Sequence, residues 1–350
     1  MVACSGRSAN MERALHSLLE QDYPGLLVCL ATHGRDDPAH ALVAELARRY
    51  PQARHIEAGK AERCGQKNKN LLDCLASLGP EIELYVFCDA NHTAPPDLVR
   101  RLLAPIIAGE ARFTTGYRFS RLHGCGPATI AFHLVNRLLL LVMSTPFLTQ
   151  PWGGAMAAEA RAFHALGVPD LWRRTVVDDC SLAGLLASKR VGVRFCTDAL
   201  VASSARDVDK KRLDAWLFRQ LLYPKLYTFA AWLGIGAALA AFTLTICLSL
   251  LFLIHSAAAP LPAVCVRAAA LGHLAGLGLC QELLRRRLAE QCRPRLWLKG
   301  LCLTVWALCG NYRRCITARS MDWRGWRYDF DGRGRVTKIV KIPEEGTESW

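Results

Sequence analysis

Apolar and polar positions follow two different spacings along the first part of the chain. Leu15, Leu18 and Leu19 lie three and four residues apart, as on one face of a helix, whereas Leu26–Thr32 is a short continuous apolar run typical of a buried strand. The same patterns predict further helices over 38–50, 67–78 and 96–109, and further strands over 84–88 and 111–117. Because short apolar strands alternate with amphipathic helices, we expect an α/β domain with a parallel sheet and crossover helices.

Two segments of this domain leave alternatives open. Met1–Cys4 resembles only the end of a first strand, which predicts either a late translation start or a missing upstream strand and anchor. The segment 127–147 is strongly apolar but contains His133, Asn136 and Arg137. It is therefore either a core helix or a helix that lies on a membrane.

A different pattern begins beyond the α/β region. Residues 229–254 carry no charge and form a run long enough to cross a bilayer as one helix. A second apolar run covers about 263–281, with Arg267 near its start and His273 inside it, and a third, shorter run covers 296–311. The chain thus divides into an α/β domain, a membrane region and a basic tail, over 1–225, 226–312 and 313–350.

The formal net charge is +14, and the position of this charge is informative. Basic residues gather before the first apolar run and after the second and third: Arg206, Lys210, Lys211, Arg212, Arg219, Lys225, Arg285, Arg286, Arg287, Arg293, Arg295, Arg313, Arg314, Arg319, Arg324 and Arg327. The loop 256–262 has no charge. The positive-inside rule then predicts an integral protein of a bacterial inner membrane or a Golgi/ER-type membrane, with its N-terminal domain and tail in the cytosol.

This topology disfavours a third crossing, so we expect 296–311 to be re-entrant or interfacial. Basic flanks also attract anionic lipid headgroups. Because the basic residues cluster at membrane edges, the charge argues against nucleic-acid binding. The 15 cysteines show no C-x-x-C pair and no zinc spacing, and several lie in apolar runs. We expect them to be small buried apolar residues in a reducing compartment.

The apolar run 84–88 ends in Asp89, and Asn91 follows two residues later. A strand that delivers a carboxylate to its carboxyl end does so at the edge where open α/β sheets bind ligands. An Asp-x-Asn pair there can hold a hard divalent cation, and that cation can hold a diphosphate. The alternative is an ordinary turn that closes the strand.

A second apolar run ends in the adjacent acids Asp178 and Asp179, before a predicted helix over 181–187. A helix cap needs only one acid. Repulsion between two neighbouring carboxylates raises one pKa toward that of a useful base. Upstream, Gly153 and Gly154 follow Trp152; paired glycines either let a ligand approach the backbone or form a tight turn.

Two polar segments are candidates for contact with a nucleotide. Asp37, after a predicted strand, can accept hydrogen bonds from a base or ribose, although an Asp before Pro is usually a helix cap. The stretch with Lys60, Lys67 and Asn70 offers cations and amides to phosphate oxygens, although a solvated loop has the same composition. Acids of this kind in a strongly basic chain suggest a nucleotide-sugar transferase.

Taken in order, these residues resemble one family. The chain is similar to membrane-anchored, inverting family-2 glycosyltransferases with the GT-A fold, and specifically to their ceramide glucosyltransferase-like branch. The resemblance covers nearly the whole chain and is carried by residues 18–24, 36–39, 59–71, 88–89, 153–154, 178–179 and the tail segment Asp322–Tyr328.

The resemblance implies a GT-A (Rossmann-like) catalytic domain over 1–225, with Asp179 as the general base. The implied metal ligands for Mn²⁺ or Mg²⁺ are Asp89 and Asn91. The implied donor-binding residues are Asp37, Lys60, Lys67, Asn70, Arg219 and Gln220. The implied acceptor or sugar pocket consists of Trp152, Gly153, Gly154, Asp178 and Tyr223.

The chain departs from the family pattern at one motif. The family carries (Gln/Arg)-x-x-Arg-Trp before its first C-terminal span, where it helps to bind the diphosphate and the acceptor. Here Leu222 stands in place of the Arg and Tyr223 in place of the Trp. The N-terminal anchor typical of the family is also absent from this sequence.

We therefore expect an enzyme that moves a hexose, glucose by resemblance, from a UDP-sugar to a membrane lipid hydroxyl, with a ceramide-like acceptor. A hopanoid or carotenoid alcohol is the alternative acceptor. A processive polysaccharide synthase would need more spans and an intact Arg-Trp motif. A catalytically inactive membrane-bound scaffold is favoured by Leu222 and Tyr223 and disfavoured by Asp37, Asp89 and Asp179.

Overall fold

The N-terminal part of the computed structural model, which describes residues 1–255 and 262–342, is built on a seven-stranded sheet. The strand order is β3-β2-β1-β4-β6-β5-β7. The strands are β1 (Val2–Ala3), β2 (Val28–Thr32), β3 (Ala53–Glu57), β4 (Leu84–Asp89), β5 (Phe113–His123), β6 (Ala155–Glu159) and β7 (Arg194–Arg206). Neighbouring strands pair in parallel except at β6, which is antiparallel to β4 and β5. The predicted α/β sheet is confirmed.

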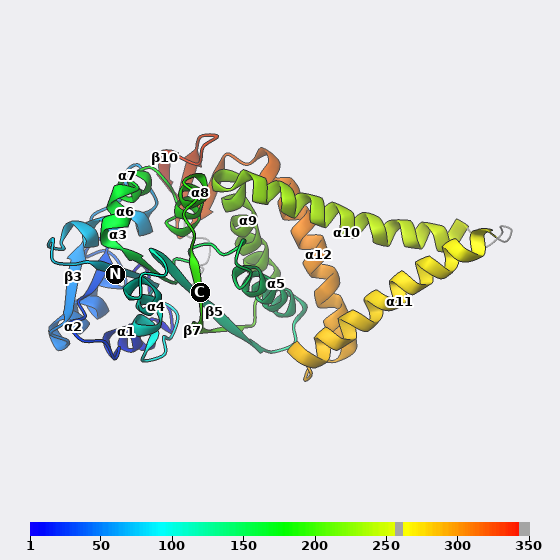
Figure 1. Ribbon diagram of the computed structural model, residues 1–350, viewed down its shortest axis with the longest axis horizontal. Coiled ribbons are helices and arrows are strands. Elements are labelled where there is room, and N and C mark those ends of the chain that lie inside the picture. Colours follow the sequence, from blue (N-terminus) through cyan, green and yellow to red (C-terminus); the bar gives the residue numbers. More distant parts are fainter. Residues whose placement is uncertain (256–261, 343–350) are drawn as a thin grey trace.

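Helices cover both faces of the sheet (Figure 1). One face carries α1 (Met11–Leu19), α2 (His40–Arg49) and α4 (Leu98–Ile107), whose leucines share a core with β1 and β2. The other carries α3 (Gln66–Ala76), α6 (Ala160–Ala165), α7 (Val168–Trp172) and α8 (Asp179–Ser188). Because both faces of the sheet are covered, each of these helices buries one side against the sheet.

Strand β4 is fixed firmly up to its last residue, Asp89. Successive side chains of a strand point to opposite faces, so Phe87 lies in one core and Cys88 in the other. The Phe87 ring stacks on Phe163 with centroids 5.5 Å apart and meets Trp172 edge-on at 5.2 Å. These aromatic contacts hold the carboxyl end of β4, and therefore Asp89, in a defined place.

The predicted helices and strands have counterparts in the structure, but three strands of the seven-stranded sheet and helix α9 (Lys210–Tyr227) were missed. β3, β6 and β7 were not anticipated, because they are either polar or alanine-rich. The apolar run 175–177 is not a strand of the sheet. It is a buried connection in which Thr175 forms an isolated antiparallel bridge with Arg335.

Two long helices leave the α/β body and converge at their far ends (Figure 1). They are α10 (Phe229–His255) and α11 (Pro262–Leu288). Both are long and apolar enough to cross a membrane, with mean hydropathies of 2.5 and 1.3, and only 6% of each apolar window is buried. Such exposure is unlike that of a core helix and indicates membrane association. Most of the predicted far-side loop, 256–261, and the end of the tail, 343–350, lie outside the described residues.

The third apolar run forms one continuous helix, α12 (Pro294–Thr317), which runs between the near ends of α10 and α11 (Figure 1). It contains no reversal of the kind a re-entrant loop needs. Its inner side packs against α5 (Pro127–Met143) and α9 (Lys210–Tyr227), with Trp297 and Ala307 buried. Its outer side leaves Leu298 and Trp306 exposed. An interfacial position for α12 stays a prediction.

Helix α5, which the sequence predicted as either a core helix or a helix on a membrane, has one buried side and one exposed apolar side. His133 and Asn136 are buried on its inner side, whereas Leu138 and Leu141 are exposed on its outer side. The buried side faces α9 and α12 through Phe132, whose ring lies 4.4 Å from that of Trp216. The helix is thus part of the protein core and also presents an apolar strip outward.

The segment predicted as a basic tail contains a folded sheet. It forms a three-stranded antiparallel sheet, β10-β9-β8, from Ser320–Trp323 (β8), Trp326–Phe330 (β9) and Val336–Lys341 (β10). Tyr328 and Phe330 are buried in a core with Val176 and Leu222 of the α/β domain. This small sheet returns from the membrane region and packs beside the acids at the start of α8.

One cysteine prediction is wrong. Cys125, just before α5, and Cys292, between α11 and α12, form a disulfide across 167 residues of sequence. The other cysteines of the chain are free, and six of them are buried as expected: Cys4, Cys29, Cys64, Cys74, Cys88 and Cys315. The pairing could not be read from spacing, because the two segments meet only after α12 packs against α5.

Candidate active site

The acids identified in the sequence meet at one edge of the sheet. Asp89 is the last residue of β4, Asp37 follows β2, and Gly153 precedes β6. Asp178 and Asp179 stand at the start of α8. Because β1, β2 and β4 are parallel, the loops after them converge at the same edge, which is where open α/β sheets bind ligands.

Lys67 connects two of these acids. Its Nζ donates to Asp89 Oδ1 at 2.8 Å, lies 3.0 Å from Asp178 Oδ2, and donates to the Gly153 carbonyl at 3.3 Å. Burial alone would lower the pKa of Lys67, but Asp178 and Asp89 outweigh it and raise the pKa well above its usual value. The lysine is therefore a permanently charged bridge between β4 and α8.

The position of Lys67 is set by a tight contact between α3 and the 175–178 segment. Asn68 Nδ2 donates to the Thr175 carbonyl at 2.9 Å, and the Gly65 N–H donates to the same carbonyl at 2.9 Å. A Cβ on Gly65 would lie 1.9 Å from the Val176 carbonyl oxygen, so only glycine permits this approach.

The two carboxylates that hold Lys67 have different pKa values. Burial would raise the pKa of Asp89, but Lys67 and then His92 outweigh it and lower the value to about 2. Burial raises the pKa of Asp178 to about 6, with Lys67 opposing the rise and Asp179 adding to it. The Asp178 side chain is fully enclosed, and its Oδ1 has no hydrogen-bond partner among the described residues.

Asp179 has a different environment from its neighbour. It is half-buried, its Oδ2 accepts from the Gly153 N–H at 2.9 Å, and its Oδ1 accepts from the Cys180 N–H at 2.6 Å. Gly153 thus lies between the two acids. A Cβ there would lie 2.4 Å from Asp178 Oδ2 and 2.6 Å from Lys67 Nζ. In the structure protein side chains lie close to this glycine, and the approach of a ligand stays a prediction.

Trp152 lines the same edge. Its ring folds back over Gly154, where a Cβ would come within 2.3 Å of it, and lies 5.1 Å from the Tyr117 ring and 5.4 Å from the His92 ring. Its backbone N–H donates to Thr115 Oγ1 at 3.0 Å. These contacts form an aromatic wall beside Asp89 and Asp179.

Asp37 lies beneath the surface of the site. Its Oδ1 accepts from the N–H groups of Gly6 at 2.9 Å and Ala39 at 3.0 Å, and its Oδ2 contacts His33 Nδ1 at 2.6 Å. The residue is 3% exposed. It ties the loop after β1 to the segment before α2, as a cap does, and a contact with the nucleotide stays a prediction.

The neighbouring Asp36 is the exposed acid of this pair. Lys60 Nζ lies 2.9 Å from Asp36 Oδ2, and the hydrogen bond from Lys60 lowers the pKa of Asp36. Lys60 is thereby held at the outer rim, near the predicted nucleotide end of the site.

Asn70 connects α3 to the segments at the ends of β1 and β2 through hydrogen bonds. Its amide donates to the Ala31 carbonyl at 3.1 Å and the Cys4 carbonyl at 3.4 Å, and its oxygen accepts from Gln66 at 2.8 Å. The residue is 1% exposed. It anchors α3 to the carboxyl ends of β1 and β2, and so supports Lys67 indirectly.

The altered motif lies on α9, next to the small C-terminal sheet. Leu222 and Tyr223 are buried in the core that α9 shares with that sheet, and burial raises the pKa of Tyr223 far above its usual value. Arg219, one turn earlier, is also buried, and Gln220 is half-buried. The positions that depart from the family motif are therefore packing positions.

Asp89, Asn91 and His92 form the remaining part of the site. Asp89 Oδ2 lies 3.9 Å from His92 Nε2, and burial lowers the pKa of His92 to about 4. Over residues 1–255 and 262–342, no three His, Cys, Asp or Glu side chains group as a metal site. Since Mg²⁺ and Mn²⁺ use one or two carboxylates together with substrate phosphates, an ionised, partly exposed Asp89 fits such a cation.

Sequence reasoning missed two residues at this edge, His92 and Arg324. His92 follows Asp89 by three residues, and its pattern carries no signal beyond that proximity. Arg324 stands in the β8–β9 turn, and its Nη1 donates to the Ser5 carbonyl at 3.0 Å, just after β1. An Arg-Gly pair between two short aromatic strands is a turn signal that could have been read.

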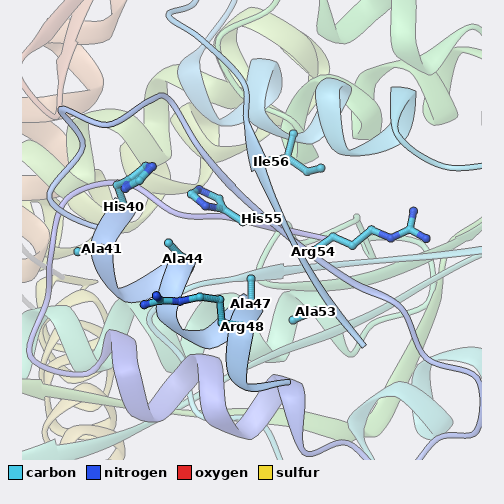
Figure 2. Close-up of a pocket in the computed structure, with 9 residues that line it drawn as sticks. All are labelled: His40, Ala41, Ala44, Ala47, Arg48, Ala53, Arg54, His55 and Ile56. Carbon is cyan, nitrogen blue, oxygen red and sulfur yellow. The ribbon is translucent and has the colours of Figure 1, made fainter. Parts of the chain in front are cut away.

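A hollow lies at the far edge of the sheet, between α2 and β3 (Figure 2). Small side chains such as Ala44 and Ala47 leave it open, with His40 and His55 together on one side of it. β2 and β1 separate β3 from β4, so this hollow is remote from Asp89.

An open, mostly parallel sheet with carboxylates and cations at its carboxyl edge defines a ligand-binding α/β enzyme domain. The chain matches the family described as Glycosyl transferase family 21 over residues 4–336. It belongs to this family and is a glycosyltransferase of the GT-A type. The sequence motifs pointed to family 2, so the class was predicted correctly and the matching family carries a different number.

Two further comparisons complete the picture. A comparison with curated proteins found no match. Among solved structures, the mannosyltransferase PcManGT from Pyrobaculum calidifontis, in complex with GDP-Man and Mn²⁺, is similar with a TM-score of 0.48 and 19% identity, covering 87% of this chain and 86% of that chain. The likeness is distant, and the ligands belong to that protein.

Proposed function

We propose that the protein transfers a hexose, glucose in the first instance, from a UDP-sugar to the hydroxyl of a membrane lipid, with inversion at the anomeric carbon. The observation that carries the proposal is the unequal pair of acids at the start of α8. Asp178 is enclosed and paired with Lys67, whereas Asp179 is half-buried beside Gly153. One acid organises the site and the other remains accessible to an acceptor.

In a single displacement, the acceptor oxygen attacks the anomeric carbon while the bond from that carbon to the diphosphate oxygen breaks. Asp179 takes the proton of the acceptor hydroxyl, and UDP leaves with the bonding electron pair. Such a positioned base contributes roughly 10²–10⁴ in rate. Lys67 supplies fixed positive charge between Asp89 and Asp178, close to where the departing diphosphate would lie.

A divalent cation is part of the proposal. Asp89, with Asn91 two residues on, would hold Mn²⁺ or Mg²⁺, and the bound cation would offset charge on the diphosphate. Because Asn91 adds no charge, we expect this cation to bind more weakly than at a site with two carboxylates. The protein's own contribution is to keep Asp89 ionised at the end of a rigid strand.

A lipid acceptor is supported by the arrangement of apolar surface. Exposed apolar side chains are present on α5 and the turn after it, including Leu141 and Phe147, and on α12, including Trp306. α12 in turn connects to the helices α10 and α11. A ceramide-like lipid is the proposed acceptor, and a hopanoid or carotenoid alcohol is the alternative.

The proposed orientation places the catalytic domain in the cytosol. Basic residues at the near ends of the helices, such as Lys225 and Arg286, support this side under the positive-inside rule. The disulfide between Cys125 and Cys292 runs against it, because disulfides are rare in the cytosol. Cys labelling from each side of sealed membranes, at a Cys engineered in place of Ser77, would settle the orientation; labelling from the outer side contradicts the proposal.

The mechanism is tested by two matched variants. Asp179→Asn keeps the size and an acceptor oxygen for the Gly153 N–H, but cannot take a proton. We expect transfer to fall by roughly 10²–10⁴ with UDP-sugar affinity retained, and Asp178→Asn to be milder. Products are identified by mass spectrometry of lipid extracts from cells with and without the gene. Near-normal turnover of Asp179→Asn would show that Asp179 is not the base.

A further inference from the structure

The lysines predicted to bind the diphosphate are both paired with carboxylates. Lys67 lies within 3.0 Å of Asp89 and Asp178, and Lys60 lies 2.9 Å from the exposed Asp36. A nucleotide diphosphate brings two or more negative charges to an edge that already holds several carboxylates. Further cations are therefore needed at this edge for the donor to bind.

The small C-terminal sheet delivers such a cation. Arg324 and Gly325 are the two central residues of the turn between β8 and β9, where Trp323 pairs with Trp326. Both have positive φ, 49° and 74°, as in the hairpin turn that usually contains Asn-Gly. A left-handed arginine is sterically disfavoured, because its Cβ comes close to the following carbonyl oxygen. The turn is thus built around an unfavourable residue whose side chain points back to the α/β domain.

The contacts of Arg324 place it at the carboxyl edge of the sheet. Its Nη1 donates to the Ser5 carbonyl, 319 residues away in sequence and directly after β1. β1 lies between β2 and β4, whose ends carry Asp37 and Asp89. Arg324 is exposed as a residue; burial of its guanidinium lowers the pKa of that group, and the charge of Asp89 opposes this fall. Arg324 is a cation at the mouth of the proposed donor site that a ligand can reach.

The neighbouring Arg219 comes from a different part of the chain. It lies on α9, one turn before Leu222, the residue that stands where the resembled family has its motif arginine. Leu222 is fully buried against the small sheet and cannot reach a ligand. The same sheet that covers Leu222 presents Arg324 on its turn, so a guanidinium is available at this edge from another element.

We propose that Arg324 binds the diphosphate of the donor and takes over the part that the motif arginine plays in the resembled family. The inference rests on the proposed function. Arg324 is a donor-binding residue, and the C-terminal sheet is part of the active site. A guanidinium suits this role because its planar fork donates two parallel hydrogen bonds to phosphate oxygens.

The test compares nucleotide binding by full-length protein in detergent, at constant Mg²⁺, using UDP, UMP and uridine as probes. Loss of a charge-assisted contact predicts that Arg324→Ala weakens UDP binding roughly 10- to 100-fold, with uridine affinity unchanged and UMP intermediate. Arg324→Lys should recover part of the loss, because it keeps the charge but not the fork. Arg327→Ala is the matched control, since Arg327 lies on the same sheet and pairs with Asp322 at 2.7 Å on an exposed surface.

Two results would overturn the inference alone. One is that Arg324→Ala binds UDP with the same affinity as the wild-type protein. The other is an equal loss of UDP and uridine binding together with a lowered unfolding temperature, which would mean that Arg324 only holds the turn against Ser5. If the wild-type protein binds neither UDP nor a UDP-sugar, the proposed function itself fails, and the inference with it.

Discussion

Replacement of Gly153 by alanine perturbs the centre of the site with a single methyl group. Gly153 does not adopt a positive φ, so alanine is compatible with its backbone. The added Cβ would lie 2.4 Å from Asp178 Oδ2 and 2.6 Å from Lys67 Nζ, whereas ordinary contacts begin at 3.4 Å. Asp178 would have to retreat by about 1 Å and Lys67 by about 0.8 Å.

The structure leaves little room for that retreat. The side chains of Lys67 and Asp178 are only 15% and 1% exposed, and the Lys67 ammonium is bound to Asp89 as well. A displacement of about 1 Å in catalytic geometry can reduce turnover about 10²-fold. Overpacking of this kind lowers the free energy of unfolding by roughly 1–3 kcal/mol. We therefore expect Gly153→Ala to lose about 10²-fold in turnover and to remain folded.

The assay is steady-state transfer from a UDP-sugar to a lipid acceptor, with thermal unfolding measured on the same preparations. Gly192→Ala is the matched control, because a Cβ there meets nothing within 4 Å and the position is remote from the acids. We expect kcat/KM to fall about 10²-fold in Gly153→Ala and to remain unchanged in Gly192→Ala. If Gly153→Ala retains near-normal kcat/KM, the Lys67–Asp178 contact does not have the importance assigned to it.

Two further predictions concern pH and metal. Burial, assisted by Arg137, lowers the pKa of His133 on α5 to about 4, below the value of about 6.5 in an unfolded chain. Stability from this residue is therefore present above pH 6.5 and lost as the pH falls toward 4, by about 2 kcal/mol between pH 7 and 5. His133→Gln, which does not titrate, should show a smaller fall in unfolding temperature over that interval, and parallel curves for the two proteins would contradict the assignment. In excess EDTA we expect transfer to be lost and then restored by Mn²⁺ or Mg²⁺; full activity in chelator would rule the metal out.

Local patterns were sufficient to predict much of the architecture. Helical spacing of leucines and short apolar runs depend on residues a few positions apart, so α1, β2 and α10 follow from the sequence. Asp89 was placed at the carboxyl end of a strand for the same reason. The alanine-rich β6 was not predicted, because its five residues form a strand only through pairing with β4 and β5.

The roles of individual polar residues depended on tertiary contacts. Asp37 and Asn70 match donor-binding positions in the sequence, and in the structure their side chains bond to backbone groups near β1, β2 and α2. Their contact with the donor stays a prediction. Lys67 reaches Asp178 only because α3 packs closely against the segment 175–178. A motif specifies the residue type, whereas partners such as Ala31 for Asn70 and Thr175 for Asn68 come from segments 39 and 107 residues away.

The sequence by itself determined the α/β order, the acids at strand ends, the apolar helices and the class of enzyme. Only the tertiary structure decided that the basic tail folds back as a sheet, that Cys125 meets Cys292, and that Arg324 arrives beside Ser5. The physical reason is the separation along the sequence of the residues that determine each feature. Periodicity and strand ends are set by covalent neighbours, whereas the composition of a site is set by which distant surfaces bury each other, and that follows from packing of the whole chain.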